Sequence, residues 1–425
     1  MIPTKSIFFV MLVASWMIVS SNANASDFVL EIFGNANLDD TIDEKDAAYV
    51  AGIIKGTNAS TNLSDANYDG KIDSQDIDRI EEIILGSEKE ITIICNPPYN
   101  GAKPQVTIHK PVERIVVLHK NAAEVIRALQ AEDKVVGLDS NLAKYKTYFS
   151  DLIEAVPFIG SWMEPDIEAI LRVNPDIVIV WTQYPSPSLL EDKLDGTGIS
   201  VVRMDLNEPL AMEEEIMQLA YILDKKEEAK EFIYFYKGYI DKISNRTEGI
   251  PEEKKLHIMS AFGDNIYAGI GSCPFGGRTM PVIAGATNIA ADLVGGQGGY
   301  VKVDLEWIIK QNPDCIVRWS SSSNSTGYES DDPAVLRKQL EEITKNPEWK
   351  EIAAVKNNRV YQFADIWSSP ACFITTAYFA KIFYPDLFKD LNPQAIHQEY
   401  LTKFQHLDYD LDKHGVFVYP PVEDN

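Results

Sequence analysis

Two oxygen-rich segments near the start of the chain have the residue types and spacing of metal-binding loops. They span 35–46 and 65–76, align at an offset of 30 residues, and carry Asp or Asn at loop positions 1, 3, 5, 9 and 12. Position 7 adds a backbone carbonyl in loops of this kind, and calcium takes about six to eight oxygen ligands. Each segment therefore predicts one Ca2+ site. The predicted ligands are Asn35, Asn37, Asp39, Thr41, Asp43 and Asp46 in the first loop and Asp65, Asn67, Asp69, Lys71, Asp73 and Asp76 in the second.

The surrounding chain predicts a duplicated loop–helix unit. A helical pattern follows each segment, over 46–55 and 76–85, and only the turn-like residues 56–64 separate the first helix from the second loop. That spacing leaves no room for the entering helix that a paired EF-hand needs. An acidic, solvated surface is the plain alternative, and two in-register copies of the ligand pattern argue against it.

In these residues the front of the chain, over 27–88, resembles a dockerin module. In that family each repeat binds one calcium ion, and the module docks onto a cohesin domain of another protein. The resemblance implies a small all-α module with two Ca2+ ions and a cohesin-bearing surface protein as a partner. Position 12 is Asp46 in one loop and Asp76 in the other. Dockerin modules have Asp at this position, whereas EF-hands have Glu.

Aromatic and cationic side chains in predicted loops form a second set of candidates. Short β-branched runs over 114–118, 134–138, 176–181 and 200–204 alternate with helical patterns such as 122–129. This alternation predicts a parallel, doubly wound α/β sheet, which binds ligands at the carboxyl ends of its strands. The loops expected at those ends supply the predicted ligand contacts Lys120, Trp162, Trp181 and Tyr184 in the first half of the body and Arg278, Trp319 and Trp367 in the second.

These side chains favour a large, planar or apolar ligand, because flat aromatic rings bury area and keep a polar N–H for orientation. Core packing is the alternative for any single Trp, and Lys120 and Arg278 suit either an anionic chelate or solvent. The six histidines lack the i, i+4 spacing of a bare zinc or manganese site. No cluster of three arginines invites a highly charged ferric siderophore. Corrinoid, haem and a neutral chelate stay open.

An internal repeat predicts the architecture of the body. Residues 166–178 match 304–316 at an offset of 138, and each copy reads as a short helix, then Asn-Pro-Asp, then a buried strand. Two copies of one unit predict two lobes of similar fold. The apolar stripes over 209–245 predict long helices between them.

The body, over 106–420, resembles the class III substrate-binding proteins of ABC importers, of the iron-complex and cobalamin type. The resemblance rests on 114–118, 131–137, the two repeated segments, Gly276-Gly277 with 288–292, and 380–385. It implies two lobes joined by a long helix, an extracellular function in delivering an iron(III) complex or corrinoid to a permease and its ATPase, and no catalysis. It also implies that Glu168 and Glu306 contact the permease, where two solvated helix glutamates are the alternative.

The expected boundaries follow from these elements: a signal peptide over 1–25, the calcium module over 27–88, a linker over 89–105, the N-terminal lobe over 106–208, connecting helices over 209–250, and the C-terminal lobe over 251–425. An apolar run over 7–19 and the Ala23-Asn24-Ala25 pattern predict an export signal that is cleaved. No Cys stands at the cleavage site. We therefore expect an exported, cell-surface protein held by a partner.

Other functional classes fit less well. A net charge of -25 argues against nucleic acid as a partner. The glycine-rich run 271–277 lacks the Gly-Lys-Ser/Thr that cradles nucleotide phosphate, and nothing in the sequence orients Cys273 toward His257 as a thiol dyad. We predict a protein that is not an enzyme. The remaining alternatives are a structural scaffold protein docked through the front module and a binder of a small oxyanion. The pairing of the four cysteines stays open.

Overall fold

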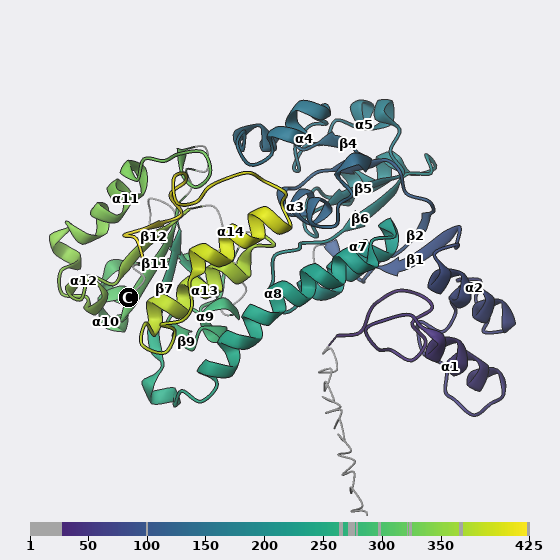
Figure 1. The fold of residues 1–425 in the computed structure, drawn as a ribbon, viewed down its shortest axis with the longest axis horizontal. Coiled ribbons are helices and arrows are strands. Elements are labelled where there is room, and N and C mark those ends of the chain that lie inside the picture. The colour runs from purple at the N-terminus through teal and green to yellow at the C-terminus, as the bar shows by residue number, and fades with distance from the viewer. Residues whose placement is uncertain are drawn as a thin grey trace, which may run out of the picture.

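A computed structural model describes residues 28–98, 101–262, 267–270, 277, 279–295, 299–320, 322, 325–364 and 369–422. It contains a small front module and two α/β lobes joined by helices (Figure 1). The predicted signal peptide over 1–25 lies outside the described residues. None of the helices in the described part is long and apolar enough to cross a membrane.

The front module consists of two loop–helix units, α1 (Glu44–Ile54) and α2 (Ser74–Leu85). Each helix begins with a capping box: Asp43 and Asp73 accept a backbone N–H from the first turn, and the third helical residue, Asp46 or Asp76, accepts the N–H of the cap. The helix positions agree with the predicted repeat.

The segment predicted as a linker, 89–105, includes regular structure among its described residues. It contains β1 (Glu90–Ile94), which pairs antiparallel with β2 (Gln105–His109), and Ile32 of the front module forms a bridge with Ile93. The described residues that follow Ile94 include Asn96, Pro97 and Pro98, and they lie between the two paired strands. The strand forms because Ile91 and Ile93 are buried in the same core as the second module helix.

The N-terminal lobe is a parallel four-stranded sheet in the order β4-β3-β5-β6. One face packs on the main hydrophobic core, and the other packs on α5 and α6. Burial on both faces explains why the strands read as continuous apolar runs. Its elements are β3 (Ile115–Val117), α3 (Lys120–Ala128), β4 (Val135–Leu138), α4 (Ser150–Ala155), α5 (Ile167–Val173), β5 (Ile177–Val180), α6 (Glu191–Leu194) and β6 (Ser200–Arg203).

Two helices connect the lobes, α7 (Met212–Leu223) and α8 (Lys226–Thr247). Asp224 adopts a left-handed conformation that ends α7, so the helical stretch predicted over 209–245 consists of two helices. Figure 1 shows α8 running from the N-terminal lobe to the C-terminal lobe as one continuous rod.

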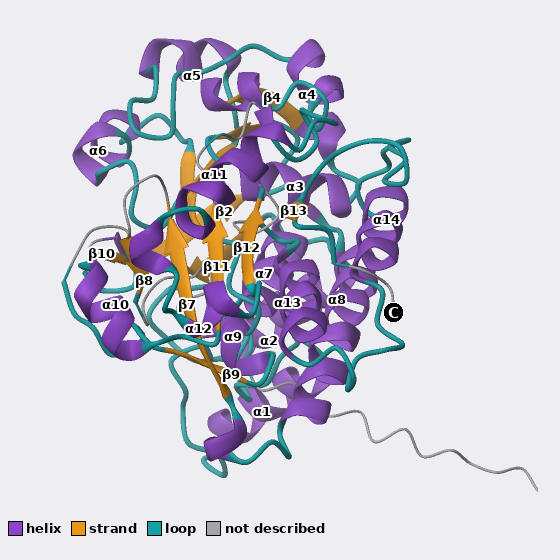
Figure 2. Ribbon diagram, turned by 90° about the vertical axis from the view of Figure 1, so that its left-hand side faces the viewer, coloured by secondary structure: helices purple, strands orange, loops and turns teal. Residues whose placement is uncertain are grey.

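The C-terminal lobe holds a mixed seven-stranded sheet in the order β10-β8-β7-β11-β12-β13, with β9 also paired to β7. Helix α13 packs against α8, α9 and α14 on one side of this sheet (Figure 2). The strands are β7 (Leu256–Phe262), β8 (Tyr267–Gly269), β9 (Ala286–Asn288), β10 (Tyr300–Lys302), β11 (Cys315–Trp319), β12 (Val360–Phe363) and β13 (Val418–Tyr419). The helices are α9 (Thr279–Ile283), α10 (Leu305–Gln311), α11 (Ala334–Thr344), α12 (Ala353–Lys356), α13 (Cys372–Phe383) and α14 (Pro393–Lys403). Short 3-10 turns occur at Glu132–Lys134, Ser140–Lys144, Pro187–Leu189, Glu252–Lys254 and Pro347–Trp349.

The repeated segments occupy equivalent places in the two lobes. Helices α5 and α10 each have seven residues, begin at an Asp cap, and end at a left-handed Asn, Asn174 or Asn312. Each leads directly into a central strand, β5 or β11. This equivalence agrees with the two-lobed α/β architecture expected from the repeat.

Candidate functional site

Lys120, the cationic side chain that was predicted to contact ligand, lies at the carboxyl edge of the N-terminal sheet. After β3, His119 caps α3, and Lys120 follows as the first helical residue. The Lys120 ammonium lies 3.8 Å from a carboxylate oxygen of Glu124 and 5.2 Å from the centre of the Tyr145 ring. Because Glu124 partly neutralises it, this lysine is a weak attractor for a small anion.

The next strand along the sheet presents Trp181. Its ring centre lies 4.4 Å from that of His119, whose burial lowers its pKa to about 3 and keeps the imidazole neutral. Arg203, at the end of β6, donates to the carbonyls of Trp181, Thr182 and Pro185. The loop over 181–185 is therefore held to the sheet by a buried guanidinium rather than left free.

Trp162 and Tyr184 meet at the same edge. Their ring centres are 5.2 Å apart in an edge-to-face arrangement, and both side chains are partly exposed. The loop of Trp162 turns at Gly160, which has a φ of +79° and forms a bridge with Pro165. Contacts thus gather the four predicted N-lobe residues, Lys120, Trp162, Trp181 and Tyr184, on two adjoining loops and the start of α3.

The outcome is different for the ligand-binding residues predicted in the C-terminal lobe. Trp319 was expected to contact ligand, but it is fully buried, donates to the Ser260 hydroxyl at 3.1 Å, and packs on Phe363 and Phe379. It belongs to the core because its side chain points toward α13 rather than out of the sheet edge. Arg278 and Trp367 lie outside the described residues, as do parts of the loops that follow β7, β11 and β12. The candidate site that the structure describes is therefore the aromatic wall of the N-terminal lobe, formed by Trp162, Trp181 and Tyr184 beside Lys120.

Sequence reasoning missed a polar network that ties the lobes together beside this wall. Tyr400 donates to Glu124 at 3.0 Å, Gln405 donates to the Glu124 carbonyl at 3.0 Å, and the Arg127 guanidinium reaches the Gln405 side chain at 3.3 Å. Tyr148 stacks on Tyr328 with ring centres 4.3 Å apart. These partners lie far apart in sequence, so no local pattern signals them.

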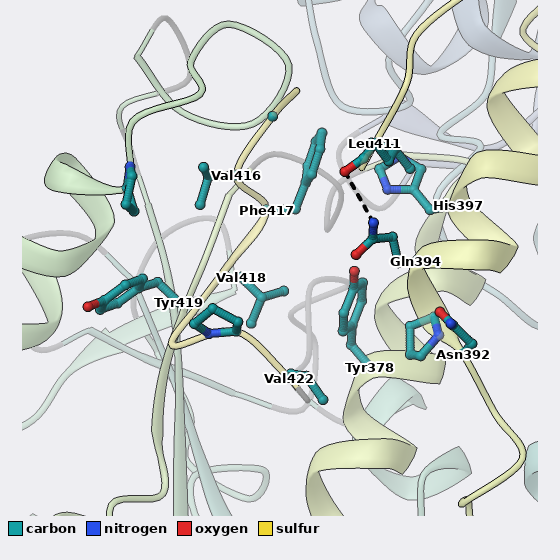
Figure 3. Close-up of a pocket in the computed structure, with 14 residues that line it drawn as sticks. Tyr378, Asn392, Gln394, His397, Leu411, Val416, Phe417, Val418, Tyr419 and Val422 are labelled. Atoms are coloured by element: carbon teal, nitrogen blue, oxygen red, sulfur yellow. Dashed lines mark hydrogen bonds between the residues drawn. The ribbon is translucent and has the colours of Figure 1, made fainter. Parts of the chain in front are cut away.

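A cavity of about 270 Å³ opens elsewhere, between β13 and helices α13 and α14 (Figure 3). Tyr378, Gln394, His397 and Phe417 are among the side chains around it, and none of the predicted ligand residues lines it. It lies beside the antiparallel edge strand of the C-terminal lobe. Sheets of this class bind ligands at the carboxyl ends of their parallel strands, so we take the aromatic N-lobe wall as the candidate site.

Both loops of the front module fold alike. In the first, Asn35 and Asn37 accept the N–H of Asp39 at 3.2 and 2.9 Å, and Asp46 accepts the N–H groups of Asn37 and Asp43. In the second, the equivalent residues make the same bonds: Asp65 and Asn67 accept from Asp69, and Asp76 accepts from Asn67 and Asp73. The repeated bonds give two loops whose side-chain oxygens share one arrangement.

The donor chemistry of these loops fits a hard divalent cation. Asp46 and Asp76 are fully buried, and burial raises the pKa of both carboxyls, to about 6 for Asp46. A buried carboxylate is costly without a compensating positive charge. In the described part of the chain no three His, Cys, Asp or Glu side chains converge on one metal position. The three carboxylates predicted for the first loop and the four predicted for the second therefore do not converge in this structure. The loops do supply amide, carboxylate and main-chain oxygens, which is the ligand class of calcium.

The two predicted docking glutamates are both at the surface. Glu168 and Glu306 are exposed, and each lies in the first turn of its helix, α5 or α10. The three cysteines in the described part, Cys95, Cys315 and Cys372, are buried free thiols.

Comparison with known proteins shows the family to which this chain belongs. Residues 115–365 match the periplasmic binding protein family. Since this match spans more than half of the chain, the protein belongs to that family. The prediction of a binding protein rather than an enzyme agrees with this result.

Individual relatives bind different solutes. The iron-uptake system-binding protein of Bacillus subtilis is 28% identical over 227 residues, which are 53% of this chain and 66% of the relative. The molybdate-binding protein MolA of Haemophilus influenzae is 25% identical over 344 residues, 72% of this chain and 90% of the relative. The solved TroA-like periplasmic binding protein FepB of Veillonella parvula gives a TM-score of 0.61 at 23% identity, covering 74% of this chain and 97% of that chain.

The turn that precedes Trp162 requires a glycine at position 160, and this requirement can be tested. A Cβ there would lie 2.5 Å from the Asp166 nitrogen and 2.7 Å from the Glu164 carbonyl oxygen, at a left-handed φ. We expect Gly160→Ala to lower the free energy of unfolding by about 2–4 kcal/mol, from strained backbone plus overlap. Gly196→Ala is the matched control, because its φ is +73° with no atom within 4 Å; it should cost about 1 kcal/mol. Urea unfolding followed by tryptophan fluorescence measures both, and equal losses would contradict the packing argument.

Proposed function

We propose that this protein is the exported, cell-surface solute-binding component of an ABC importer, and that it captures a metal chelate, an iron(III) complex or a corrinoid, for delivery to the permease. The observation that carries the proposal is the aromatic wall of Trp162, Trp181 and Tyr184 at the carboxyl edge of the N-lobe sheet. Relatives named for iron uptake and for haem uptake support a chelate as cargo.

A small oxyanion is the second candidate, because one relative that covers much of the chain is named for molybdate. The charge at the wall argues against it. The Lys120 ammonium there shares its surroundings with the nearly buried Glu124 carboxylate, and a second ammonium, that of Lys144, lies 5.2 Å from the centre of the same Tyr145 ring. A bare oxyanion gains little from a cation already paired with a carboxylate, whereas a large chelate gains from burying apolar area against the rings.

The cargo proposal predicts saturable quenching of tryptophan fluorescence by cobalamin, haem or a ferric chelate. Trp181→Ala should weaken that binding about 10-fold, since a stacked aromatic pair contributes about 0.5–1.5 kcal/mol beyond the area that it buries. Tyr234→Ala is the control, because Tyr234 is 84% exposed on α8 and belongs to no part of the wall. Calorimetry with the same ligands and with molybdate tests the alternative. Tight molybdate binding together with no response to any chelate would overturn the chelate assignment.

The calcium module is a further part of the proposed function. Two Ca2+ ions are assigned to the loops, through Asn35, Asn37, Asp39, the Thr41 carbonyl, Asp43 and Asp46 and through Asp65, Asn67, Asp69, the Lys71 carbonyl, Asp73 and Asp76. The oxygen-only donor sets and the buried carboxylates of Asp46 and Asp76 support this assignment. A cohesin-bearing surface protein is the partner that the dockerin resemblance suggests, and the mature protein should then leave the cell surface when calcium is chelated.

Calorimetry of the mature chain should find two calcium ions per molecule. Asp39→Ala and Asp69→Ala should each remove one of them, because each deletes an oxygen ligand from a single loop. Asp195→Asn changes the charge at an exposed position far from both loops in sequence and should leave the stoichiometry at two. Absence of binding heat in the unaltered chain would refute the assignment.

Glu168 and Glu306 are proposed to contact basic residues of the permease, one from each lobe. Their exposure and matched positions on α5 and α10 support this role. Charge reversal of both, to Lys, should abolish uptake by cells while leaving ligand affinity in solution unchanged. Glu253→Lys, at another exposed position, is the control for a change of net charge. A loss of solution affinity in the double variant would assign the two glutamates to the ligand cleft instead.

A further inference from the structure

Helix α7 carries a stripe of polar side chains that faces the front module and its hairpin. Glu215, Gln218 and Tyr221 are spaced three residues apart, so they share one face of the helix, and they are only 7%, 5% and 3% exposed. Their neighbours on the helix are buried and mostly apolar. Polar groups at such depth need partners, and each of the three finds partners outside the helix.

The C-terminal end of the stripe holds the first calcium loop. The Tyr221 hydroxyl accepts the N–H of Ile42 at 2.9 Å and lies 3.3 Å from the Thr41 hydroxyl. Thr41 occupies the loop position whose carbonyl is assigned to calcium. An ion that orders the Thr41 carbonyl also orders the N–H of the next residue, Ile42. That N–H is hydrogen-bonded to Tyr221 of the body.

The middle of the stripe holds the hairpin. Gln218 donates to the Ile94 carbonyl at 3.2 Å. Beside it, the Lys110 ammonium donates to the Tyr221 carbonyl at 2.7 Å and pairs with the buried Glu88 carboxylate at 2.7 Å. Side chains of the module, the hairpin, α7 and α8 also belong to a single hydrophobic core. Figure 1 shows the hairpin of β1 and β2 next to α7 and β6. The module is thus built into the N-terminal lobe.

The N-terminal end of the stripe reaches the ligand wall. The Glu215 carboxylate accepts from the Asn96 side chain at 2.7 Å and from the N–H groups of Asp205 and Leu206 at 2.8 and 2.6 Å. Asp205 in turn accepts the N–H of Thr182 at 3.0 Å, directly after Trp181. The hairpin also meets this loop itself, since Gln183 donates to the Pro97 carbonyl at 3.3 Å.

We propose that the front module is a calcium-dependent positioning element of the solute cleft. Calcium in the first loop fixes the positions of Thr41 and Ile42 against Tyr221. Helix α7 and the hairpin, whose positions are then fixed in turn, restrict the 181–185 loop through the contacts of Glu215 and Asn96. This inference rests on the calcium sites of the proposed function and adds that the first site acts on the body. The second loop touches the hairpin through an exposed contact, Tyr68 to Gln105 at 2.8 Å, and is not part of this route.

The sequence offers a clean readout, because every tryptophan in the described residues lies at or beyond position 162, outside the module and the hairpin. Thermal unfolding of the mature chain by tryptophan fluorescence therefore reports on the body. Saturating calcium should raise its Tm by roughly 3–5 °C, since a ligand that binds only the folded state stabilises it by mass action. Hydrogen exchange measured by mass spectrometry should slow over 177–206 as well as over 35–46.

Two pairs of variants locate the route. Tyr221→Phe keeps the ring and removes the hydroxyl, and it should at least halve both calcium effects on the body, whereas Tyr68→Phe should leave them intact. A merely structural Tyr221 would lower the Tm equally with and without calcium, and that result would overturn the inference. Asp39→Asn, in the first loop, should abolish the effects over 177–206, and Asp69→Asn, in the second, should preserve them.

Calorimetry on the same samples separates this inference from the calcium assignment on which it rests. Binding heat in the unaltered chain with no change in the tryptophan Tm or in exchange over 177–206 would overturn the inference and leave the calcium sites in place. No binding heat would overturn both. By linkage, Tyr221→Phe should also weaken calcium binding at the first loop by the same factor that it weakens the coupling.

Discussion

The burial of the α7–α8 helix pair is the constraint on which the rest of this structure depends. Both helices contribute side chains to one hydrophobic core that also contains residues of the front module, the N-lobe sheet and α13 of the C-terminal lobe. A rod that is packed along its length on both lobes resists bending, because any hinge would expose part of that core. The lobes are therefore held at a nearly fixed separation, so a ligand that binds between them, as we propose, meets side chains that are already in place.

The polar network around Glu124 adds a second, independent tie between the lobes. Tyr400 and Gln405 from the last helix region reach α3 of the N-terminal lobe, and Glu329 accepts from the backbone N–H and hydroxyl of Thr147. The bonds to Glu124 are buried and costly to break one at a time, because each would leave an unpaired group, whereas the bonds between Thr147 and Glu329 are exposed. With α8 on one side and this network on the other, small adjustments of loops are a more economical route to ligand capture than a large hinge motion.

Contacts of this kind also hold the loop of the proposed ligand wall in place. The loop over 181–185 is held by Arg203 from within the sheet, by Asp205 through Thr182, and by the hairpin through Gln183. Trp181 and Tyr184 therefore present their rings from a supported loop, which lowers the entropy that a ligand must remove on binding. A supported aromatic wall suits the rigid, flat cargo that we propose, and the chain belongs to the periplasmic binding protein family.

The sequence alone determined the features that local spacing encodes. The duplicated oxygen pattern predicted two loop–helix units at the observed positions, and the repeat at an offset of 138 predicted matched helices and strands in two lobes. Apolar runs predicted the N-lobe strands, since burial on both faces removes polar residues from them. The position of a residue after a strand was enough to nominate Trp162, Trp181 and Tyr184.

Only the tertiary structure decided which way side chains point and what covers them. Trp319 and Trp181 follow similar sequence signals, yet one is buried against α13 and the other stands at the sheet edge. The apparent linker became a hairpin because Ile91 and Ile93 find partners in the module and the body, and the stripe of Glu215, Gln218 and Tyr221 meets segments up to 180 residues away. Local periodicity reports whether a residue is buried or exposed on its own element. It carries no record of the distant segment that buries it, and that pairing is what joins the front module and its hairpin to α7 and the 181–185 loop.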